Sequence, residues 1–335
     1  MRSEDMVARV PKVELHVHLE GTLEPEHAFA LGQRNGVALP YASAGQMRDA
    51  YRFSDLRSFL DVYYRACSVL ATERDFFDLT WAYLERAASD GVRHVEPFFD
   101  PQTHLARGVS MKAVVGGISA ALEEGRGSLG ISSRLIMCFL RDEGAASAAE
   151  VLDVAIEVGR GRIAGVGLDS AEVGFPPGLF AEVFRRARTA GLHRVAHAGE
   201  EGPASYITDA LDTLGAERID HGVRCLDDPD LVRRLVRDRV CLTVCPKSNV
   251  SLRVVDRMED HPLRRMLDAG LAVCVNSDDP AYFGGYVADN YRAVCSALDL
   301  DPDEVVTLAR NAIEGSFAEE ARKEELRREL AAVAS

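Results

Sequence analysis

The sequence predicts a single (β/α)8 (TIM) barrel, and three observations favour this α/β fold. Short runs rich in β-branched residues alternate with helix-like segments along most of the chain, as expected for parallel strands joined by helices. Eight such runs occur, which is the number of strands in this barrel. No linker rich in proline, glycine and serine divides the chain. The prediction therefore covers residues 1–335 as one domain.

The eight strands are predicted in chain order. The first four are "VELHVHL", "VRHVEPFF", "SRLIMCFL" and "IAGVGLDS", at residues 13–19, 92–99, 133–140 and 163–170. The last four are "LHRVAHAG", "RIDHGV", "CLTVCPKS" and "LAVCVNSDD", at residues 192–199, 218–223, 241–248 and 271–279. Active sites of this fold lie at the carboxyl ends of the strands, so polar residues at those ends are candidate functional residues.

Helix-like segments lie between the predicted strands. In "AAEVLDVAIEVGR" and "PDLVRRLVRD" the apolar residues recur at three- and four-residue spacing, which indicates helices with one buried face. The spacing between strands is uneven in one place. Residues 20–91, which include "YRFSDLRSFLDVYYRAC" and "FFDLTWAYLERAAS", are predicted to form a long helical insertion after the first strand.

Composition argues against several classes of protein. The formal net charge is -14 and the chain has only four lysines, which is unlike a nucleic-acid-binding surface. No apolar run approaches the length of a membrane span, and "MRSEDMVARVPK" lacks the apolar core of a signal peptide. The seven cysteines are scattered and form no C-x-x-C pair, as expected for buried thiols in a reducing compartment. We expect a cytoplasmic protein, and the sequence leaves a homo-oligomer open.

Two histidines interrupt the first predicted strand. His16 and His18 in "KVELHVHLEGT" are two residues apart, so both side chains point to the same side of the strand, into the barrel. Alone, the pair could equally be two hydrogen-bonded histidines of the core. A chance H-x-H is expected in about a quarter of chains of this length and histidine content, so the motif is weak evidence by itself.

Further polar residues fall at the same predicted rim. The segments "HAGEE", "DHG" and "NSDDP" end or follow strands five, six and eight, and supply His197, Glu200, His221, Asp278 and Asp279. Three imidazoles and a carboxylate suit Zn²⁺ and leave one coordination position for water, as in catalytic zinc sites. The sequence therefore predicts a metal-dependent hydrolase.

The motifs "PKVELHVHLEGTL", "HAGEEG", "RIDHGVR", "CPKSNV" and "VNSDDPAYFGGY" occur in order along nearly the whole chain. Together they resemble the adenosine/adenine deaminase family of the metal-dependent amidohydrolase superfamily. The resemblance implies one Zn²⁺ per chain with four ligands, His16, His18, His197 and Asp278. It also implies that Glu200 passes a proton to the purine ring, that His221 orients and deprotonates the metal-bound water, and that Asp279 bonds the N7 side of the purine.

The chemistry implied by the resemblance suits these residue types. Zn²⁺ lowers the pKa of bound water towards ~7, which gives a nucleophile for C6 of a 6-aminopurine. Attack at C6 breaks the aromaticity of the ring, and its cost falls if ring N1 is protonated as the bond forms, so an acid must lie within ~3 Å of N1. The expected reaction is adenine plus water to hypoxanthine plus ammonia, in purine salvage. The end of strand four, "GVGLDSAE", has no lysine to bridge a second metal, and the H-x-E and P-C-x-x-C motifs of the other zinc deaminase fold are absent.

The segment "GLDSAEVGFPP", residues 167–177, bears on the choice of substrate. It resembles the D-S-(S/A)-E-x-G pattern of the adenine deaminase branch, and Glu172 stands where adenosine deaminases have a glycine. The resemblance assigns Asp169 and Glu172 to substrate binding. We hypothesise that Glu172 accepts a hydrogen bond from N9–H, or from a tautomeric N3–H, and crowds out a ribose. The alternative is a solvent-exposed loop glutamate.

Two residues depart from the pattern of the branch. Lys247 and Arg253 in "CPKSNVSLRVV" stand where leucine and a small or apolar residue are usual. They could recognise an anion on a modified or N6-substituted aminopurine, or they could be a surface lysine and an arginine paired with Asp256 or Glu259. A third alternative is a non-catalytic purine-binding homologue, although all six presumed metal-binding and catalytic positions carry workable residues.

Overall fold

Parallel strands form the centre of the molecule, and the computed structural model describes residues 2–334. The strands are β1 (Lys12–Glu14), β2 (Val92–Val95), β3 (Phe98–Phe99), β4 (Ser132–Ser133), β5 (Leu135–Leu140), β6 (Ile163–Asp169), β7 (His193–Ala198), β8 (Arg218–His221), β9 (Cys241–Val244) and β10 (Ala272–Val275). They pair in the orders β1-β2-β4 and β10-β9-β8-β7-β6-β5-β3. Each of the eight predicted strands therefore overlaps at least one observed strand, although the first shares only residues 13 and 14 with β1.

Backbone contacts join the two sheets into a barrel. The segment after β1 forms parallel bridges on both sides, between Val17 and Asp278 and between His18 and Phe98. The His18 amide donates to the Asp278 carbonyl at 2.9 Å, and the Asp278 amide donates to the His16 carbonyl at 3.1 Å. We call this contact between residues 16–18 and Asp278 the seam of the barrel. The first and last strands of the chain meet there, which confirms the predicted fold class.

Several strands end earlier than the sequence predicts. The strand predicted at 271–279 stops at Val275, and the one predicted at 218–223 stops at His221. His221 and Asp278 have positive φ angles of 61° and 65°, and Ser170, directly after β6, has a φ of 69°. Extended pairing stops at such left-handed residues. Strands β6 and β8 therefore end beside or at a left-handed residue, whereas β10 ends three residues before Asp278.

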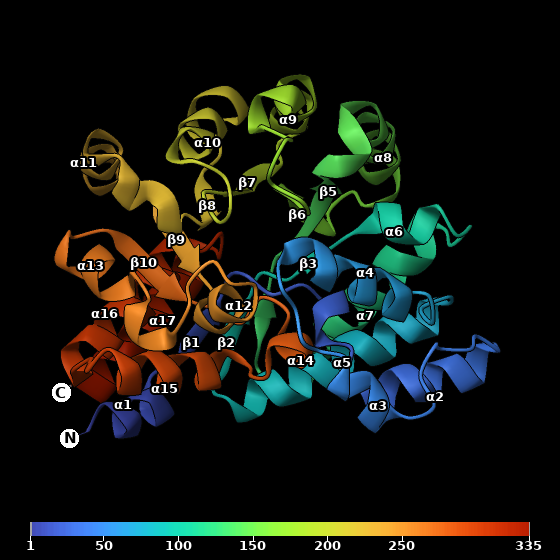
Figure 1. Ribbon diagram of the computed structural model, residues 1–335, viewed down its shortest axis with the longest axis horizontal. Helices are drawn as coiled ribbons and strands as arrows, with labels where there is room; N and C mark the ends of the chain where they lie inside the picture. Colours follow the sequence, from blue (N-terminus) through green and yellow to red (C-terminus); the bar gives the residue numbers. More distant parts are fainter. Residues whose placement is uncertain (1, 335) are drawn as a thin grey trace.

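Helices surround the barrel (Figure 1). In chain order they are α1 (Ser3–Arg9), α2 (Pro25–Asn35), α3 (Ala44–Asp49), α4 (Leu56–Cys67), α5 (Glu73–Ser89), α6 (Pro101–Leu105), α7 (Met111–Ser128), α8 (Gly144–Val158), α9 (Ala181–Thr189), α10 (Ala204–Asp209), α11 (Pro229–Asp238), α12 (Pro246–Ser251), α13 (Leu263–Asp268), α14 (Pro280–Phe283), α15 (Val287–Ala297), α16 (Pro302–Gly315) and α17 (Glu320–Ala334). Capping side chains and prolines fix where several of these helices begin. In α11, for example, the Asp228 carboxylate caps the amides of Asp230 and Leu231 beside Pro229.

The predicted insertion at 20–91 is helical in the structure, because it comprises a short 3-10 turn (Glu20–Thr22) and helices α2 to α5. Helix α5 packs against α7 of the outer ring. Helix α4 instead directs Leu56, Phe59 and Tyr63 towards the carboxyl ends of the strands, where they line a cavity. The insertion thereby closes the mouth of the barrel.

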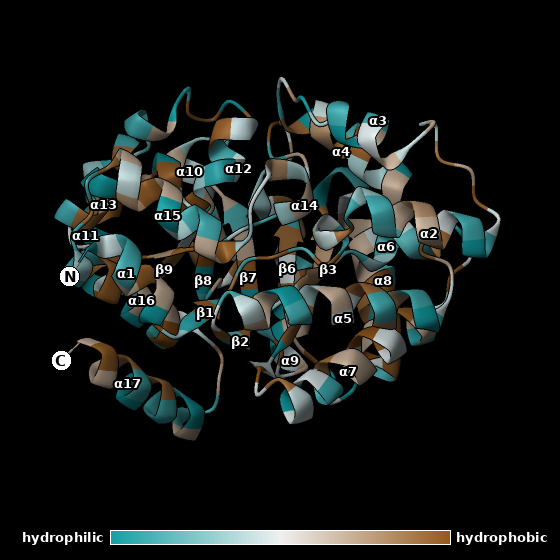
Figure 2. Cartoon of the chain, turned by 90° about the horizontal axis from the view of Figure 1, so that it is seen from below, coloured by the Kyte–Doolittle hydropathy of each residue, from teal (hydrophilic) through white to brown (hydrophobic). Residues whose placement is uncertain are grey.

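Hydrophobic side chains fill the space between strands and helices. Figure 2 shows brown, hydrophobic strands inside a shell of helices that carry teal, hydrophilic residues. No helix within residues 2–334 is long and apolar enough to cross a membrane.

Candidate active site

The residues predicted to bind metal converge at the carboxyl ends of the strands. His16 and His18 follow β1, His197 lies near the end of β7, and Asp278 follows β10. Their side chains are all less than a tenth exposed. The strand ends of the barrel therefore bring together ligands that lie up to 262 positions apart in the sequence.

The donor atoms of these residues are spaced as they would be around one small cation. The Asp278 Oδ1 atom lies 3.1 Å from His16 Nε2 and 3.4 Å from His18 Nε2. The His18 and His197 Nε2 atoms are 3.2 Å apart. Four ligands placed tetrahedrally at the usual Zn–N distance would be separated by about 3.3–3.4 Å. The observed spacings are close to that value.

The ring nitrogens also lack the partners expected of core histidines. His16 Nε2 is buried and has no hydrogen-bond partner within residues 2–334. The two Nε2 atoms of His18 and His197 face each other, although burial lowers the pKa of both rings, to about 4 for His18 and well below its usual range for His197. One ring can donate an Nε2–H to the other, and when both rings carry their proton on Nδ1 instead, the two Nε2 lone pairs face each other as ligands of a cation do. The donor set therefore fits a zinc ion.

A hydrogen-bonded relay of Thr243 and Asp220 positions the His16 ring. Thr243 Oγ1 lies 2.9 Å from His16 Nδ1 and donates to Asp220 Oδ1 at 2.8 Å. Asp220 Oδ2 also lies 3.7 Å from His197 Nδ1. Such outer partners fix the orientation of metal-binding imidazoles. Neither Thr243 nor Asp220 was singled out from the sequence, although Asp220 lies within the quoted segment "RIDHGV".

His221 and Glu200 lie on the other side of Asp278. His221 Nε2 is 3.8 Å from Asp278 Oδ2 and 3.5 Å from Glu200 Oε2. His221 can also be grouped with the metal-binding residues, because its donor atom and those of His16, His197 and Asp278 lie within 4.8 Å of one another. His18 approaches Oδ1 of Asp278, whereas His221 faces Oδ2. The distances therefore place both His18 and His221 close enough to Asp278 to contribute to a metal site.

Burial sets the protonation of this second group. It raises the pKa of Glu200 well above its usual range, and the charge of Asp278 adds to the effect. It lowers the pKa of His221 to about 3. Burial therefore favours the protonated form of Glu200 and the neutral form of the His221 ring. This is the pairing of an acid with a base that proton transfer requires.

A small cavity opens onto these groups. Its apolar wall is formed by α4 together with Leu140 and Leu252, and its polar wall includes His18, His197, Glu200, His221, Asp278 and Asp279. The cavity volume is about 40 Å³, far below the ~300–1,000 Å³ of pockets for drug-sized ligands. The cavity suits a small, flat ligand.

Asp279 is held in place by a close backbone contact. A Cβ atom on Gly21 would lie 2.0 Å from Asp279 Oδ1 and 2.7 Å from its Cα, so only glycine fits there. Burial, and then the charge of Asp278, raises the pKa of Asp279 well above its usual range. Asp279 can therefore act as a hydrogen-bond donor.

Asp169, predicted to bind substrate, lines the cavity together with Asp100. Asp169 Oδ2 lies 3.6 Å from His18 Nδ1, and burial raises the pKa of Asp169 to about 7. Asp100 follows β3 and accepts a hydrogen bond from the Tyr63 hydroxyl at 3.3 Å. Asp100 was missed from the sequence. The rule applied to the other strands, an acid directly after an apolar strand in "EPFFDP", would have identified it.

Glu172 is buried, at 1 % exposure, so the alternative of an exposed loop glutamate is wrong. Its carboxylate accepts four backbone N–H groups. Gly199 donates to Oε1 at 2.6 Å, and Glu200, Glu201 and Gly202 donate to Oε2 at 3.0, 2.9 and 2.8 Å. We call residues 199–202 the acid loop. Glu172 does not line the cavity, so it acts on the site through this loop, and direct contact with the base stays a prediction.

The negative charge of Glu172 has a buried counterpart in Arg141. The Arg141 guanidinium donates to the His197 carbonyl and to the Phe175 carbonyl, both at 2.9 Å. Burial lowers the pKa of Arg141, and the charge of Glu172 opposes that shift. The acid loop is therefore held by the buried Glu172 carboxylate, and Arg141 partly balances its negative charge.

Lys247 and Arg253 do not line the cavity. Lys247 is half-buried and packs its methylene groups against Gly285, while Arg253 is exposed and has a positive φ of 64°. A ligand enclosed by the cavity would touch Leu252 rather than these two cations. The geometry disfavours the predicted recognition of an anion by this pair.

Comparisons with known proteins agree with the geometry. The family model described as adenosine deaminase matches residues 11–333. A protein named adenine deaminase from Streptomyces coelicolor is 61% identical over 326 residues, 97% of this chain and 95% of that protein. One of the same name from Cupriavidus necator is 57% identical over 97% of this chain and 93% of that protein.

Solved structures are similar over the whole barrel. The crystal structure of adenine deaminase from Arthrobacter aurescens superimposes with a TM-score of 0.95 at 55% identity, and the match covers 97% of this chain and 99% of the other. An amidohydrolase from Burkholderia ambifaria with bound Zn gives a TM-score of 0.90 at 28% identity, over 99% and 93% of the two chains. This chain belongs to the adenosine deaminase family, and it is a deaminase that acts on a C–N bond.

Proposed function

We propose that this enzyme deaminates adenine hydrolytically to hypoxanthine and ammonia, with one zinc ion per chain. The observation that carries the proposal is a small cavity in which the buried carboxyl group of Glu200 faces a cluster of side chains that could hold a metal ion. The relatives and the solved structure named adenine deaminase support the choice of substrate.

The lining of the cavity suits a flat heterocyclic base. Leu56, Phe59 and Leu252 form its apolar side, and the cavity encloses a volume of about 40 Å³. A flat heterocycle can lie against the apolar wall and direct its polar edge towards Glu200 and Asp279. Burial of the flat faces contributes affinity, and the polar groups fix the orientation of the base.

We assign the zinc ion to His16, His18, His197 and Asp278, because their donor atoms face a common point at 3.1–3.4 Å spacing. A bound zinc ion supplies water that is activated near neutral pH. His221 lies outside this set, beside Oδ2 of Asp278. We assign it to hold and deprotonate the attacking water, for which a neutral imidazole is suited.

Glu200 and Asp279 act on the purine itself. The protonated Glu200 carboxyl delivers its proton to ring N1 as C6 is attacked, so that negative charge does not accumulate on the ring. Asp279, protonated in its buried setting, donates a hydrogen bond to N7. Asp169 completes the polar wall on the side of His18. Together these contacts orient C6 towards the metal ligands.

Two alternatives remain for the test. A modified or N6-substituted aminopurine would need to engage Lys247 or Arg253, which lie outside the cavity. A non-catalytic purine-binding homologue would bind zinc and adenine without releasing ammonia.

The proposal also includes purine salvage in the cytoplasm, supported by seven cysteines that are all buried and free. Association into a homo-oligomer stays a prediction.

The test is an ammonia-release assay on zinc-loaded and chelator-treated protein, with adenine, adenosine and N6-methyladenine as substrates. Rapid turnover of adenine alone, lost on chelation and restored by zinc, is the expected result. Glu200→Gln should abolish turnover and retain zinc, while Glu182→Gln on the exposed face of α9 should match the wild type. Zinc-loaded protein that is silent on all three substrates would overturn the proposal.

A further inference from the structure

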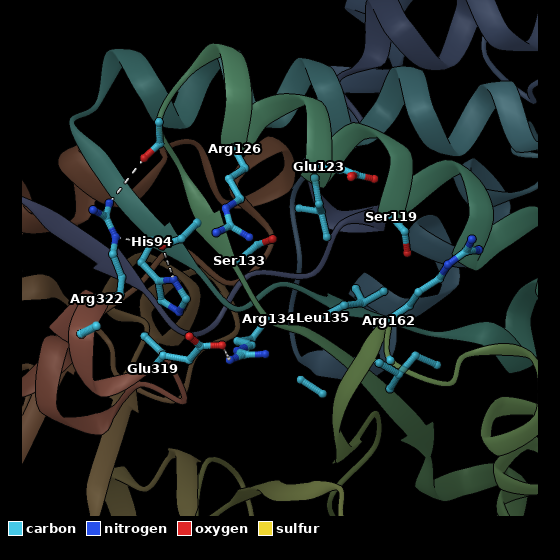
Figure 3. Close-up of a pocket in the computed structure, with 18 of the residues that line it drawn as sticks. His94, Ser119, Glu123, Arg126, Ser133, Arg134, Leu135, Arg162, Glu319 and Arg322 are labelled. Atoms are coloured by element: carbon cyan, nitrogen blue, oxygen red, sulfur yellow. Dashed lines mark hydrogen bonds and ion pairs between the residues drawn. The ribbon is translucent and has the colours of Figure 1, made fainter.

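A second and much larger cavity lies at the opposite end of the barrel. It has a volume of about 750 Å³ and is formed where strands β2, β4 and β6 begin, between helices α7 and α17. Figure 3 shows its lining. The deaminase site lies at the carboxyl ends of the strands, so neither the substrate nor the metal accounts for this cavity.

Four arginines from different elements line the cavity, Arg126, Arg134, Arg162 and Arg322. Two of them are engaged. Arg134 pairs with Glu319 at 3.0 Å and Arg322 with Glu325 at 2.9 Å.

Arg126 and Arg162 have no such partner. Neither guanidinium has a hydrogen bond or ion pair with any residue of the described chain, 2–334, and both side chains are exposed to the cavity. They approach it from different sides, Arg126 from α7 and Arg162 from the segment before β6 (Figure 3). Two unpaired cations thus face one concave space in a chain with a net charge of -14.

Uncharged and acidic groups lie between the two cations. Ser119 and Ser133 line the cavity, and Ser119 Oγ is buried without a hydrogen-bond partner in the part of the chain that the structure describes. Glu123, one turn before Arg126 on α7, also lines it and carries no ion pair there. These groups can donate to anionic oxygens or accept from hydroxyl groups.

We propose that this cavity binds a small metabolite that carries two separate phosphate groups on a hydroxylated backbone, of the sugar bisphosphate class. Guanidinium groups bind phosphate oxygens through paired, charge-assisted hydrogen bonds. Arg126 and Arg162 enter the cavity from different sides (Figure 3), which suits two anionic groups rather than one. The free hydroxyl of Ser119 and the carboxylate of Glu123 match the hydroxyl groups of the ligand backbone. An extended polyanion such as nucleic acid is disfavoured by the acidity of the whole chain.

The test is calorimetric titration of the zinc-loaded enzyme with fructose 1,6-bisphosphate at low ionic strength, with fructose 6-phosphate and inorganic phosphate titrated in parallel. The bisphosphate should bind most tightly. Each Arg→Gln substitution at 126 or 162 should weaken binding roughly tenfold or more, the usual effect of losing a charged hydrogen bond.

The matched control removes two other exposed arginines that lie outside the cavity, in Arg160→Gln/Arg188→Gln. This variant should bind like the wild type, and all variants should keep full adenine turnover because the active site is at the other end of the barrel. Equal weakening in the control would show non-specific attraction and overturn the proposal. Failure of the wild type to bind the bisphosphate more tightly than inorganic phosphate would also overturn it.

Discussion

The four hydrogen bonds from the acid loop to the Glu172 carboxylate, which we call the clamp, lead to a quantitative prediction for Glu172→Gln. A carboxylate can accept at both oxygens, whereas glutamine offers one carbonyl oxygen and an NH2 group that only donates. If the new carbonyl oxygen takes the Oε2 position, it still accepts from the amides of Glu200, Glu201 and Gly202. The new NH2 group then takes the Oε1 position, where it faces the Gly199 N–H and cannot accept from it.

The magnitude follows from those four contacts. Hydrogen bonds to a charged acceptor contribute ~1.5–3 kcal/mol each and neutral ones ~0.5–1.5, and an unsatisfied buried donor costs ~1–3 kcal/mol. Three bonds that each weaken by ~1 kcal/mol, together with one unsatisfied donor, should therefore destabilise the acid loop by roughly 4–6 kcal/mol. Because Glu200 lies in this loop, its displacement should lower kcat about 10²-fold, the effect expected of a misplacement near 1 Å.

The assay combines steady-state kinetics on adenine with urea unfolding. We expect kcat to fall much more than KM rises, since the apolar wall that binds the base is untouched. Glu182→Gln, which removes a carboxylate that pairs with Arg185 on the surface of α9, should change neither quantity. Wild-type kcat and unfolding free energy in Glu172→Gln would refute the clamp. A Glu172→Gly variant that is fully stable and gains adenosine turnover would instead show direct contact with the substrate.

Three further predictions concern the groups around the site. Thr243→Val removes the relay to His16 and should lower zinc affinity roughly 10- to 100-fold, measured by competition with a chelator; unchanged affinity would contradict the relay. Gly21→Ala should push Asp279 out of position and raise KM for adenine, whereas Gly127→Ala, where a Cβ meets nothing, should not. Burial raises the pKa of Glu14 to about 7. The stabilisation that the protonated Glu14 carboxyl contributes is therefore complete below pH ~4.5, and it is lost as the pH rises through 7. Glu14→Gln should therefore gain up to ~3 kcal/mol over the wild type between pH 5 and pH 8 in urea unfolding, and parallel pH profiles would contradict this.

The strands and most of the site were predictable because both depend on local patterns. Alternating β-branched and helical segments gave eight strand positions, and the polar residues at their ends converge in the structure. The ends of the strands were not predictable in the same way. The left-handed backbone at His221 and Asp278 depends on tertiary contacts at the mouth of the barrel, so an apolar run alone overestimates the length of a strand.

The role of Glu172 shows a second limit. Its position was evident from the loop that follows β6, but its partners are backbone amides of residues 199–202. Amide groups leave no trace in the pattern of side chains, so the sequence suggested the nearest chemically sensible partner, the substrate. Asp100 was missed for a simpler reason, because the rule about acids at strand ends was applied to some strands and not to the second.

The seam of the barrel has a consequence for how the enzyme assembles. The proposed metal ligands His16 and His18 lie on one side of the seam and Asp278 on the other, so the site can form only after these two segments have met. A metal ion bound there would act as a cross-link between the first and last strands of the barrel, added late in folding. Backbone amides of residues 16–18 and 278 should exchange hydrogen fastest in metal-free protein and become protected on zinc binding. Loss of metal would then favour local opening at the seam, where proteases could reach the chain.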